Sequence, residues 1–152
     1  MQEDDIIVIE TNIDDMNPQF YPHLIDQLLG AGALDAYLIP IIMKKGRPGV
    51  LLSALARPEQ AEDLADLILR ETTSIGVRLY PAHRRTLTRR IVPIDTLFGP
   101  IRLKVVHADD LARYTPEYED CLKAAQTAGV PLAEVYTAVH KAADEHRADW
   151  AL

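Results

Sequence analysis

The order of short apolar segments and turn residues is the feature that most constrains the fold of this sequence. Residues 6–9 (IIVI) are short, continuous and β-branched, which is typical of a buried strand. The Asn17-Pro18 pair then favours a helix start, because Asn is a good cap and Pro suits the first helical position. The helix that follows has Phe20 and Leu24 on its apolar side. The chain therefore begins with a strand and an amphipathic helix.

The same alternation continues as far as residue 82. Residues 34–43 and 50–56 are typical of two strands joined by the turn KKGRPG, and Pro40 places the first of them near a sheet edge or a bulge. Pro58 opens a second amphipathic helix, and residues 74–82 follow as a fourth strand. The resulting order β-α-β-β-α-β is that of the ferredoxin-like sandwich, an α+β fold.

A β-hairpin and two helices are expected after the sandwich. Residues 88–96 and 101–107 are typical of two strands joined by the turn LFGP. Helices are expected over residues 116–128, where Gly129 provides a stop, and over residues 131–147. The sequence therefore predicts a ferredoxin-like βαββαβ sandwich followed by a β-hairpin and C-terminal helices.

The length and composition agree with one ordinary domain and a small appendage. The chain has 152 residues, of which 48% are hydrophobic, so it can bury a core and is not expected to be disordered. We expect residues 1–107 to form the sandwich with its added hairpin, and residues 108–152 to form a helical segment. Cys121 is the only cysteine, so neither an internal disulfide nor a cysteine-based zinc site is expected.

The charge balance and the absence of targeting signals limit the classes of partner. With a formal net charge of -7, the chain is a poor candidate for binding DNA or long RNA, whereas a small phosphorylated ligand needs only a local basic patch. No run approaches the ~20 apolar residues of a membrane helix. The start of the sequence has no signal-peptide pattern. Together with the single cysteine, these features favour a cytoplasmic protein without a membrane partner.

Two adjacent carboxylates, Asp14 and Asp15, lie in the connection between the first expected strand and the first expected helix. Oxygen ligands of this kind suit a hard divalent cation such as Mg²⁺ or Mn²⁺, which could then accept the phosphates of a nucleotide. The structural alternative is that the carboxylates only complement the positive end of the helix dipole. The spacing does not choose between these interpretations.

The turn MKKGRPG places Lys44, Lys45 and Arg47 close together between two strands. Arginine makes forked contacts with phosphate and lysine supplies a point charge, so the turn could clamp a phosphorylated ligand. Alternatively, these side chains form a solvated hairpin tip that protects an edge strand from pairing with other chains.

A third polar segment joins the second helix to the fourth strand. Thr72, Thr73 and Ser74 precede Gly76 and Arg78. Hydroxyls, exposed backbone N–H groups and an arginine suit phosphate oxygens, although the segment has neither the glycine spacing nor the ending of a P-loop. Alternatively, the hydroxyl residues end the helix and the glycine permits a bend.

The C-terminal part offers weaker patterns. Tyr114 and Tyr118 lie on either side of Thr115-Pro116-Glu117, and a tyrosine could stack on a base or bond to a sugar. Alternatively, Thr115 caps a helix, the glutamate lies near the positive helix end and the tyrosine packs. His140 and Asp144 are four residues apart on an expected helix, where a surface hydrogen bond is a simpler explanation than a metal site.

Five blocks in the same order resemble the LarC family, the nickel insertion protein of lactate racemase cofactor biosynthesis. The blocks are ETNIDDMNP, LIPIIMKKGRPGVLLSALARPE, RETTSIGVR, FGPIRLKV and PEYEDCLKAAQTAGVPLAEVY. The similarity runs over residues 10–139 and covers the family's C-terminal domain only. We expect the N-terminal portion, with any histidine-rich nickel-handling segment, to lie outside this sequence.

The resemblance implies a specific reaction. Members of the family insert nickel into pyridinium-3,5-bisthiocarboxylic acid mononucleotide, which gives the nickel-pincer nucleotide, and CTP is cleaved to CMP and pyrophosphate. The C-terminal domain is associated with CTP and a divalent metal, and it is expected to form a homotrimer or homohexamer. Residues 1–107 would then be the part that binds CTP and the metal.

We assign roles within this reaction on chemical suitability. Asp14 and Asp15 are the expected ligands of a Mn²⁺ or Mg²⁺ that bridges the triphosphate. The expected phosphate and nucleoside contacts are Lys44, Lys45, Arg47, Thr72, Thr73, Ser74, Arg78, Glu117 and Tyr118. Carboxylate oxygens suit this hard cation better than Ni²⁺, which prefers imidazole or sulfur. The fragment is therefore expected to bind CTP without completing nickel insertion. The rival hypotheses are a nucleotide-binding module without turnover and an assembly scaffold that binds no nucleotide.

Overall fold

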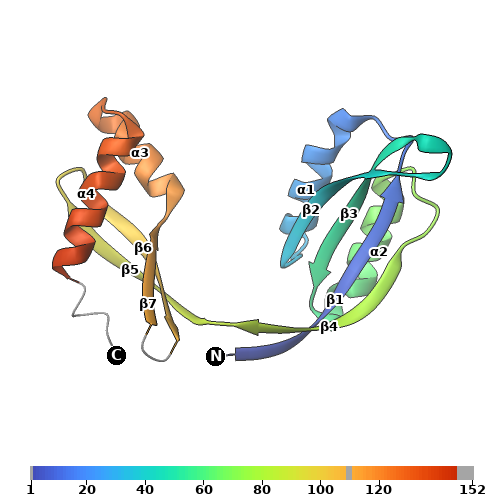
Figure 1. Ribbon diagram of the computed structural model, residues 1–152, viewed down its shortest axis with the longest axis horizontal. Coiled ribbons are helices and arrows are strands. Elements are labelled where there is room, and N and C mark those ends of the chain that lie inside the picture. The colour runs from blue at the N-terminus through green and yellow to red at the C-terminus, as the bar shows by residue number, and fades with distance from the viewer. Residues whose placement is uncertain (1, 109–110, 147–152) are drawn as a thin grey trace. The chain divides into compact units, whose positions relative to one another are not determined.

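The computed structural model describes residues 2–108 and 111–146 and divides into two compact units. Glu3–Arg85 forms the N-terminal unit, and the described residues from Thr86 onward, together with Gln2, belong to the C-terminal unit (Figure 1). None of the helices within the described residues combines the length and the apolar character needed to cross a bilayer.

The N-terminal unit alternates strands and helices in the predicted order. Its elements are β1 (Gln2–Ile13), α1 (Tyr21–Gly30), β2 (Asp35–Ile42), β3 (Pro48–Ala56), α2 (Ala61–Glu71) and β4 (Arg78–Thr86). The strands form one sheet in the order β2-β3-β1-β4, and β3 is antiparallel to both β1 and β2. This is the ferredoxin-like arrangement, so the predicted α+β class is confirmed. Pro40 lies in the edge strand β2, where its missing N–H is tolerated.

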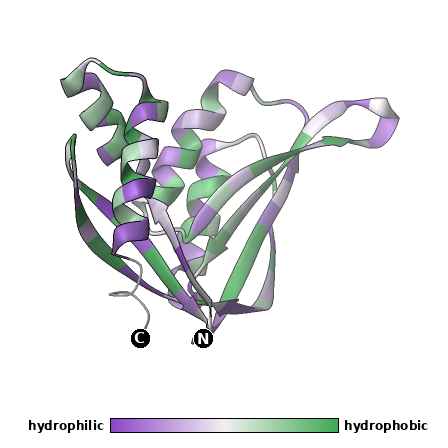
Figure 2. Cartoon of the chain, turned by 60° about the vertical axis from the view of Figure 1, so that its left-hand side comes forward, coloured by the Kyte–Doolittle hydropathy of each residue, from purple (hydrophilic) through white to green (hydrophobic). Residues whose placement is uncertain are grey.

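One face of this sheet and the two helices enclose the first hydrophobic core. Ile9 and Leu52 are fully buried on the strands, and Leu24, Leu64 and Ile68 are buried on the helices that cover them. Burying each such side chain stabilises the fold by about 1.5–3 kcal/mol. Figure 2 shows the corresponding alternation of hydrophobic and hydrophilic segments along the helices. The packing fixes β1 in the interior of the sheet, so its last residues are held from both sides.

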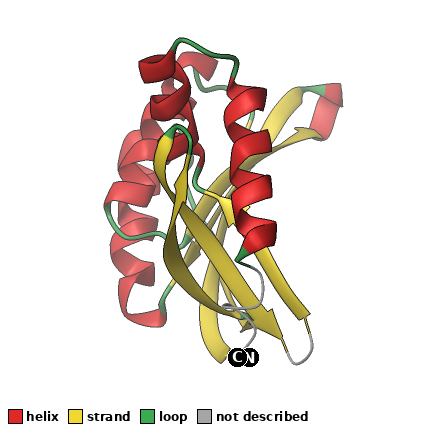
Figure 3. Ribbon diagram, turned by 90° about the vertical axis from the view of Figure 1, so that its left-hand side faces the viewer, coloured by secondary structure: helices red, strands yellow, loops and turns green. Residues whose placement is uncertain are grey.

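The C-terminal unit is a second small α+β body. Its elements are β5 (Thr88–Thr96), β6 (Gly99–Ala108), β7 (Leu111–Pro116), α3 (Tyr118–Ala128) and α4 (Leu132–Glu145). The strands are antiparallel in the order β5-β6-β7, and Figure 3 shows the β5–β6 hairpin with its short turn. Leu103, Val105, Cys121, Val135 and Val139 form its buried core.

The structure divides the chain at residue 85, whereas the sequence suggested a division at residue 107. The hairpin follows the sandwich in sequence, but its buried side chains pack with α3 and α4 in a core of their own. The strand β7 was not predicted at all. Thr115 lies in this strand instead of capping a helix, and Glu117 is the cap residue of α3. Pro116 ends the strand, and the helix predicted to begin at residue 116 begins two residues later, at Tyr118.

The fourth strand also begins later than predicted, at Arg78 instead of residue 74. The reason is local hydrogen bonding. The Ser74 N–H donates to the Thr72 hydroxyl (3.1 Å), and the Ser74 hydroxyl lies 2.9 Å from the Gly76 carbonyl oxygen. Side-chain oxygens thus compete with the sheet for these backbone groups and keep the segment in a loop.

A forked ion pair joins the sheet to the helices in the C-terminal unit. Asp120 on α3 accepts hydrogen bonds from the Arg102 backbone N–H (3.0 Å), Nε (2.8 Å) and Nη2 (2.8 Å). These bonds favour the ionised carboxylate and lower the pKa of Asp120 to about 2 from its ordinary 3.8.

This depressed pKa predicts a pH-dependent contribution to stability. The contribution is present above pH 3.8 and is lost as the pH falls through about 2, because protonation removes the acceptor for Arg102. We therefore expect Asp120→Asn to lower the free energy of unfolding at neutral pH, and the difference from the unaltered chain to shrink in acid. Urea unfolding at a series of pH values measures this. Glu119→Gln, one residue away, controls for the loss of one negative charge. If the loss of unfolding free energy in Asp120→Asn does not change with pH, the ion pair with Arg102 is not the source of the stability.

Candidate nucleotide and metal site

Three of the segments singled out in the sequence meet at the end of β1. They line a cavity of about 420 Å³ in the N-terminal unit, which we call the β1-end pocket. Its lining residues are Thr11, Asn12, Asp14, Asp15, Met43, Lys44, Thr73, Ser74, Ile75, Gly76 and Arg78. The carboxylate pair, the basic turn and the hydroxyl-rich loop therefore face one space, although they are far apart in the sequence.

The turn between β2 and β3 approaches the end of β1 because residue 49 is a glycine. A Cβ at Gly49 would lie 2.7 Å from the carbonyl oxygen of Ile13 and 2.9 Å from Sδ of Met43. Lys45, which has a left-handed backbone (φ 64°), closes the turn together with Gly46. This close approach brings Lys44 beside the two carboxylates.

The loop after α2 is tied to the same strand end by hydroxyl groups. The Thr11 side chain, only 3% exposed, donates to the carbonyl oxygen of Gly76 (2.9 Å) and also contacts the Ser74 hydroxyl. Thr72 is the residue that ends α2, and its hydroxyl donates to the Ile68 carbonyl oxygen (2.7 Å). Thr72 therefore ends the helix, as the structural alternative predicted, while Thr73 and Ser74 line the pocket.

Both carboxylates are already held by neighbouring groups. Asp14, with a 17% exposed side chain, lies 3.4 Å from Nη1 of Arg47. The Thr73 hydroxyl donates to Oδ1 of Asp15. These contacts orient two anionic groups beside each other, and Arg47 offsets part of their mutual repulsion.

Arg78 also lines the pocket. Its Nη2 donates to Oδ1 of Asn12 (2.9 Å) and lies 3.3 Å from Glu10. The Tyr80 hydroxyl donates to the same Glu10 (2.9 Å), and this hydrogen bond to an anion raises the pKa of Tyr80. The network holds the guanidinium at the pocket edge. Thr11 and Asn12 were not predicted as site residues, although two polar residues near the end of an apolar strand were a usable signal.

The oxygen atoms of the pocket fit a hard cation that takes its remaining coordination bonds from a bound ligand. In the part of the chain that the structure describes, no group of three or more His, Cys, Asp or Glu side chains is arranged to hold a metal. Asp14 and Asp15 offer carboxylate oxygens, however, and Mg²⁺ sites commonly use one or two carboxylates together with phosphates and water. The pocket therefore suits a cation that arrives with a phosphorylated ligand.

The remaining candidates lie outside this pocket. Lys45, Arg47 and Thr72 belong to its turns but not to its lining. Glu117 and Tyr118 are in the C-terminal unit, where the Glu117 carboxylate lies 3.4 Å from Nζ of Lys104 and Tyr118 is 52% exposed. An ion pair is enough to explain the glutamate.

His140 and Asp144 both contact the hydroxyl of Tyr114, whereas their spacing suggested a surface hydrogen bond between the two side chains. The Tyr114 hydroxyl lies 3.2 Å from Nδ1 of His140 and 3.3 Å from Oδ1 of Asp144.

Comparisons with known proteins agree with the resemblance seen in the sequence. A family model described as "Nickel insertion protein" matches residues 1–136. The chain belongs to this family. It is 48% identical over 140 residues to the pyridinium-3,5-bisthiocarboxylic acid mononucleotide nickel insertion protein of Acetivibrio thermocellus, covering 92% of this chain and 34% of that protein. It is 42% identical over 144 residues to the protein of the same name from a Thermotoga species, covering 94% of this chain and 36% of the relative. The chain therefore spans about a third of the length of these relatives.

A solved structure matches both units of the fold. It is described as LarC2, the C-terminal domain of a cyclometallase involved in the synthesis of the NPN cofactor of lactate racemase, in its apo form. The TM-score is 0.90 with 37% identity, and the match covers 94% of this chain and 99% of the other. A crystal structure from Methanopyrus kandleri also matches, with a TM-score of 0.63, 23% identity and 88% and 85% of the two chains covered, and it supports the fold alone.

The close approach at Gly49 predicts the outcome of a small substitution. Gly49→Ala forces Ile13 or Met43 to move, and overpacking of this kind typically costs about 1–3 kcal/mol of unfolding free energy. Gly30→Ala is the matched control, because an added Cβ meets no atom within 4 Å there. Urea unfolding of both variants measures the difference. Equal stability of the two variants would show that the turn is not packed against β1 as described.

Proposed function

We propose that the β1-end pocket binds CTP together with Mn²⁺ or Mg²⁺, and that this chain is the CTP-binding part of a CTP-dependent nickel insertase. The observation that carries the proposal is the meeting of Asp14 and Asp15 with Lys44, the hydroxyl loop and Arg78 in one cavity. Two carboxylates alone would repel a triphosphate. A divalent cation between the carboxylates and the triphosphate removes this repulsion. The basic groups of the pocket can then contact the phosphates.

The residues divide into three roles in this proposal. Asp14 and Asp15 ligate the cation, and the Thr73 hydroxyl positions Asp15. Lys44 and Arg78, which both line the pocket, contact phosphate oxygens. Arg47 orients Asp14 in the absence of nucleotide. The hydroxyl of Ser74 offers a further hydrogen bond to phosphate, while Lys45 and Thr72 shape the two turns.

The same groups would assist cleavage of CTP to CMP and pyrophosphate. Negative charge develops on the leaving pyrophosphate, and cations fixed around it stabilise that charge more in the transition state than in the ground state. The cation supplies further neutralisation when it is bound. Arg78 is held by its hydrogen bonds to Asn12 and Glu10, so little reorganisation of this group is needed at the moment of reaction.

Nickel insertion itself would need more than this chain. The relatives named above insert nickel into pyridinium-3,5-bisthiocarboxylic acid mononucleotide, and they are about three times as long. The oxygen ligands of the pocket suit Mn²⁺ or Mg²⁺ better than Ni²⁺. We therefore propose that Ni²⁺ is a substrate handled by another part of the full-length protein, which acts in the cytoplasm as a homotrimer or homohexamer. A nucleotide-binding or oligomerisation module without turnover is the alternative.

Calorimetric titration of CTP into this chain tests the proposal. We expect binding with Mn²⁺ present, much weaker binding of ATP, and a loss of at least about tenfold in CTP affinity for Asp14→Asn/Asp15→Asn, because the cation loses its charged ligands. Asp63→Asn/Asp66→Asn on the exposed face of α2 removes the same charge elsewhere and should bind normally. Absence of CTP binding, or equal binding by the two double variants, would contradict the proposal.

A further inference from the structure

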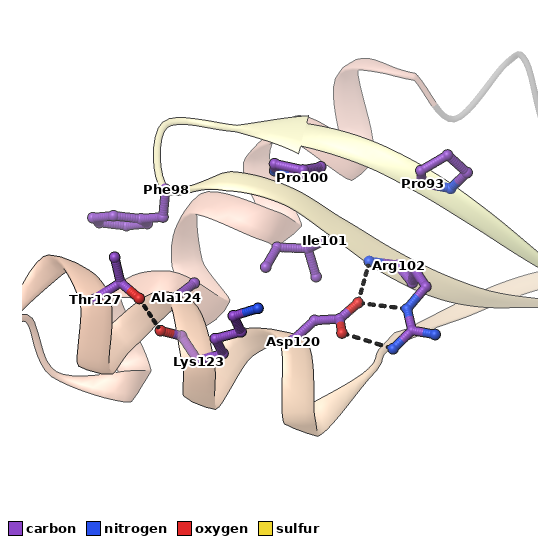
Figure 4. Close-up of a pocket in the computed structure, with 9 residues that line it drawn as sticks. All are labelled: Pro93, Phe98, Pro100, Ile101, Arg102, Asp120, Lys123, Ala124 and Thr127. Carbon is purple, nitrogen blue, oxygen red and sulfur yellow. Dashed lines mark hydrogen bonds and ion pairs between the residues drawn. The ribbon is translucent and has the colours of Figure 1, made fainter.

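A second cavity lies in the C-terminal unit, between the β5–β6 hairpin and α3. It has a volume of about 390 Å³, and we call it the hairpin–helix pocket (Figure 4). Its lining residues are Pro93, Phe98, Pro100, Ile101, Arg102, Asp120, Lys123, Ala124 and Thr127. None of these residues was a candidate from the sequence. The volume falls within the range of about 300–1,000 Å³ that is usual for small-molecule sites.

One side of the pocket is a flat apolar wall. Ile101 is 1% exposed at its base, and the Phe98 ring is half-buried against the second core. The turn fixes the backbone of Phe98, because its N–H donates to the Thr96 hydroxyl oxygen (3.1 Å) and that hydroxyl donates to the Gly99 carbonyl oxygen (2.7 Å), and packing against the core holds the ring. A preorganised aromatic face of this kind suits a planar ring, since little conformational entropy is lost on binding.

The other side carries charge. Arg102 and Asp120 satisfy each other through the forked ion pair, so they form a neutral unit at one end of the pocket. Figure 4 shows the Lys123 side chain pointing along α3 toward Asp120 and Ile101. Asp120 is the nearby carboxylate whose pKa the Lys123 charge helps to lower, but its oxygens are bonded to Arg102, and none of the described carboxylates lies within ion-pair distance of the Lys123 ammonium. The Thr127 hydroxyl is engaged with the Lys123 carbonyl oxygen (2.8 Å). Lys123 is therefore the cation that this pocket presents to an incoming group.

We propose that the hairpin–helix pocket binds a pyridinium mononucleotide, with the ring against Phe98 and an anionic group on Lys123. A planar ring with an anionic substituent fits both walls, and a cationic ring gains additional attraction from the face of an aromatic side chain. The choice of ligand rests on the proposed function, in which a pyridinium mononucleotide receives nickel and a cytidine nucleotide is cleaved. Both ligands are planar rings with anionic groups, and the cationic ring favours the pyridinium.

Nicotinic acid mononucleotide is a stable probe with this chemistry, since it has a pyridinium ring, a carboxylate and a phosphate. Calorimetric titration into the chain should show saturable binding. Lys123→Gln keeps a polar side chain, shorter by one bond, and removes its charge, so it should weaken binding by about tenfold, the usual effect of losing a charge-assisted hydrogen bond. Lys141→Gln on the exposed side of α4 removes the same charge from the same unit and should bind normally.

Two further arms separate this proposal from the proposed function. The Asp14→Asn/Asp15→Asn variant should bind nicotinic acid mononucleotide as the unaltered chain does, whatever happens to its CTP binding. The part of the binding that Lys123→Gln weakens should be stronger for the pyridinium probe than for CMP. Absence of saturable binding of the probe, equal affinities of Lys123→Gln and Lys141→Gln for it, or CMP binding that is both tighter than probe binding and weakened by Lys123→Gln would each overturn the proposal.

Discussion

The hydrogen bond from the buried Thr11 hydroxyl to the Gly76 carbonyl oxygen is the contact on which the β1-end pocket depends. It joins the end of an interior strand to a loop that would otherwise have no regular hydrogen-bonding partners. A buried polar group without a partner costs about 1–3 kcal/mol, so this pairing holds the loop in place. With the loop anchored, Thr73 reaches Asp15, and the hydroxyl-rich segment becomes one wall of a cavity instead of a free surface turn.

Charge balance explains the rest of the pocket. Asp14 and Asp15 stand side by side, and each is held by one neighbour: Arg47 for the first and Thr73 for the second. Such an arrangement is costly for two bare anions and becomes favourable when a divalent cation is shared. Lys44 and Arg78 then supply positive charge within the same pocket. The β1-end pocket and the hairpin–helix pocket are alike in that each has cationic side chains in its lining.

Local patterns predicted the elements, and long-range contacts decided the sites. Strand β5 and the glycine stop of α3 were predictable because alternation, proline and glycine act over a few residues. Strand β7 was missed because its Thr-Pro pair is also a helix-start signal. The meeting of Asp14, Lys44 and Ser74 could not be derived from spacing, since periodicity does not say which strand ends are neighbours. Thr11 and Asn12 were overlooked inside a strand, and the hairpin–helix pocket depends on packing between Phe98 and α3 that no local motif signals.

The central claim is that the two carboxylates and a nucleotide share one cation, and electron paramagnetic resonance of free Mn²⁺ tests it most directly. The account predicts that the unaltered chain binds Mn²⁺ weakly alone and markedly more tightly with CTP, because each ligand must raise the affinity of the other by the same factor. Mn²⁺ binding that is unchanged by CTP would mean that the cation and the nucleotide do not meet in the β1-end pocket.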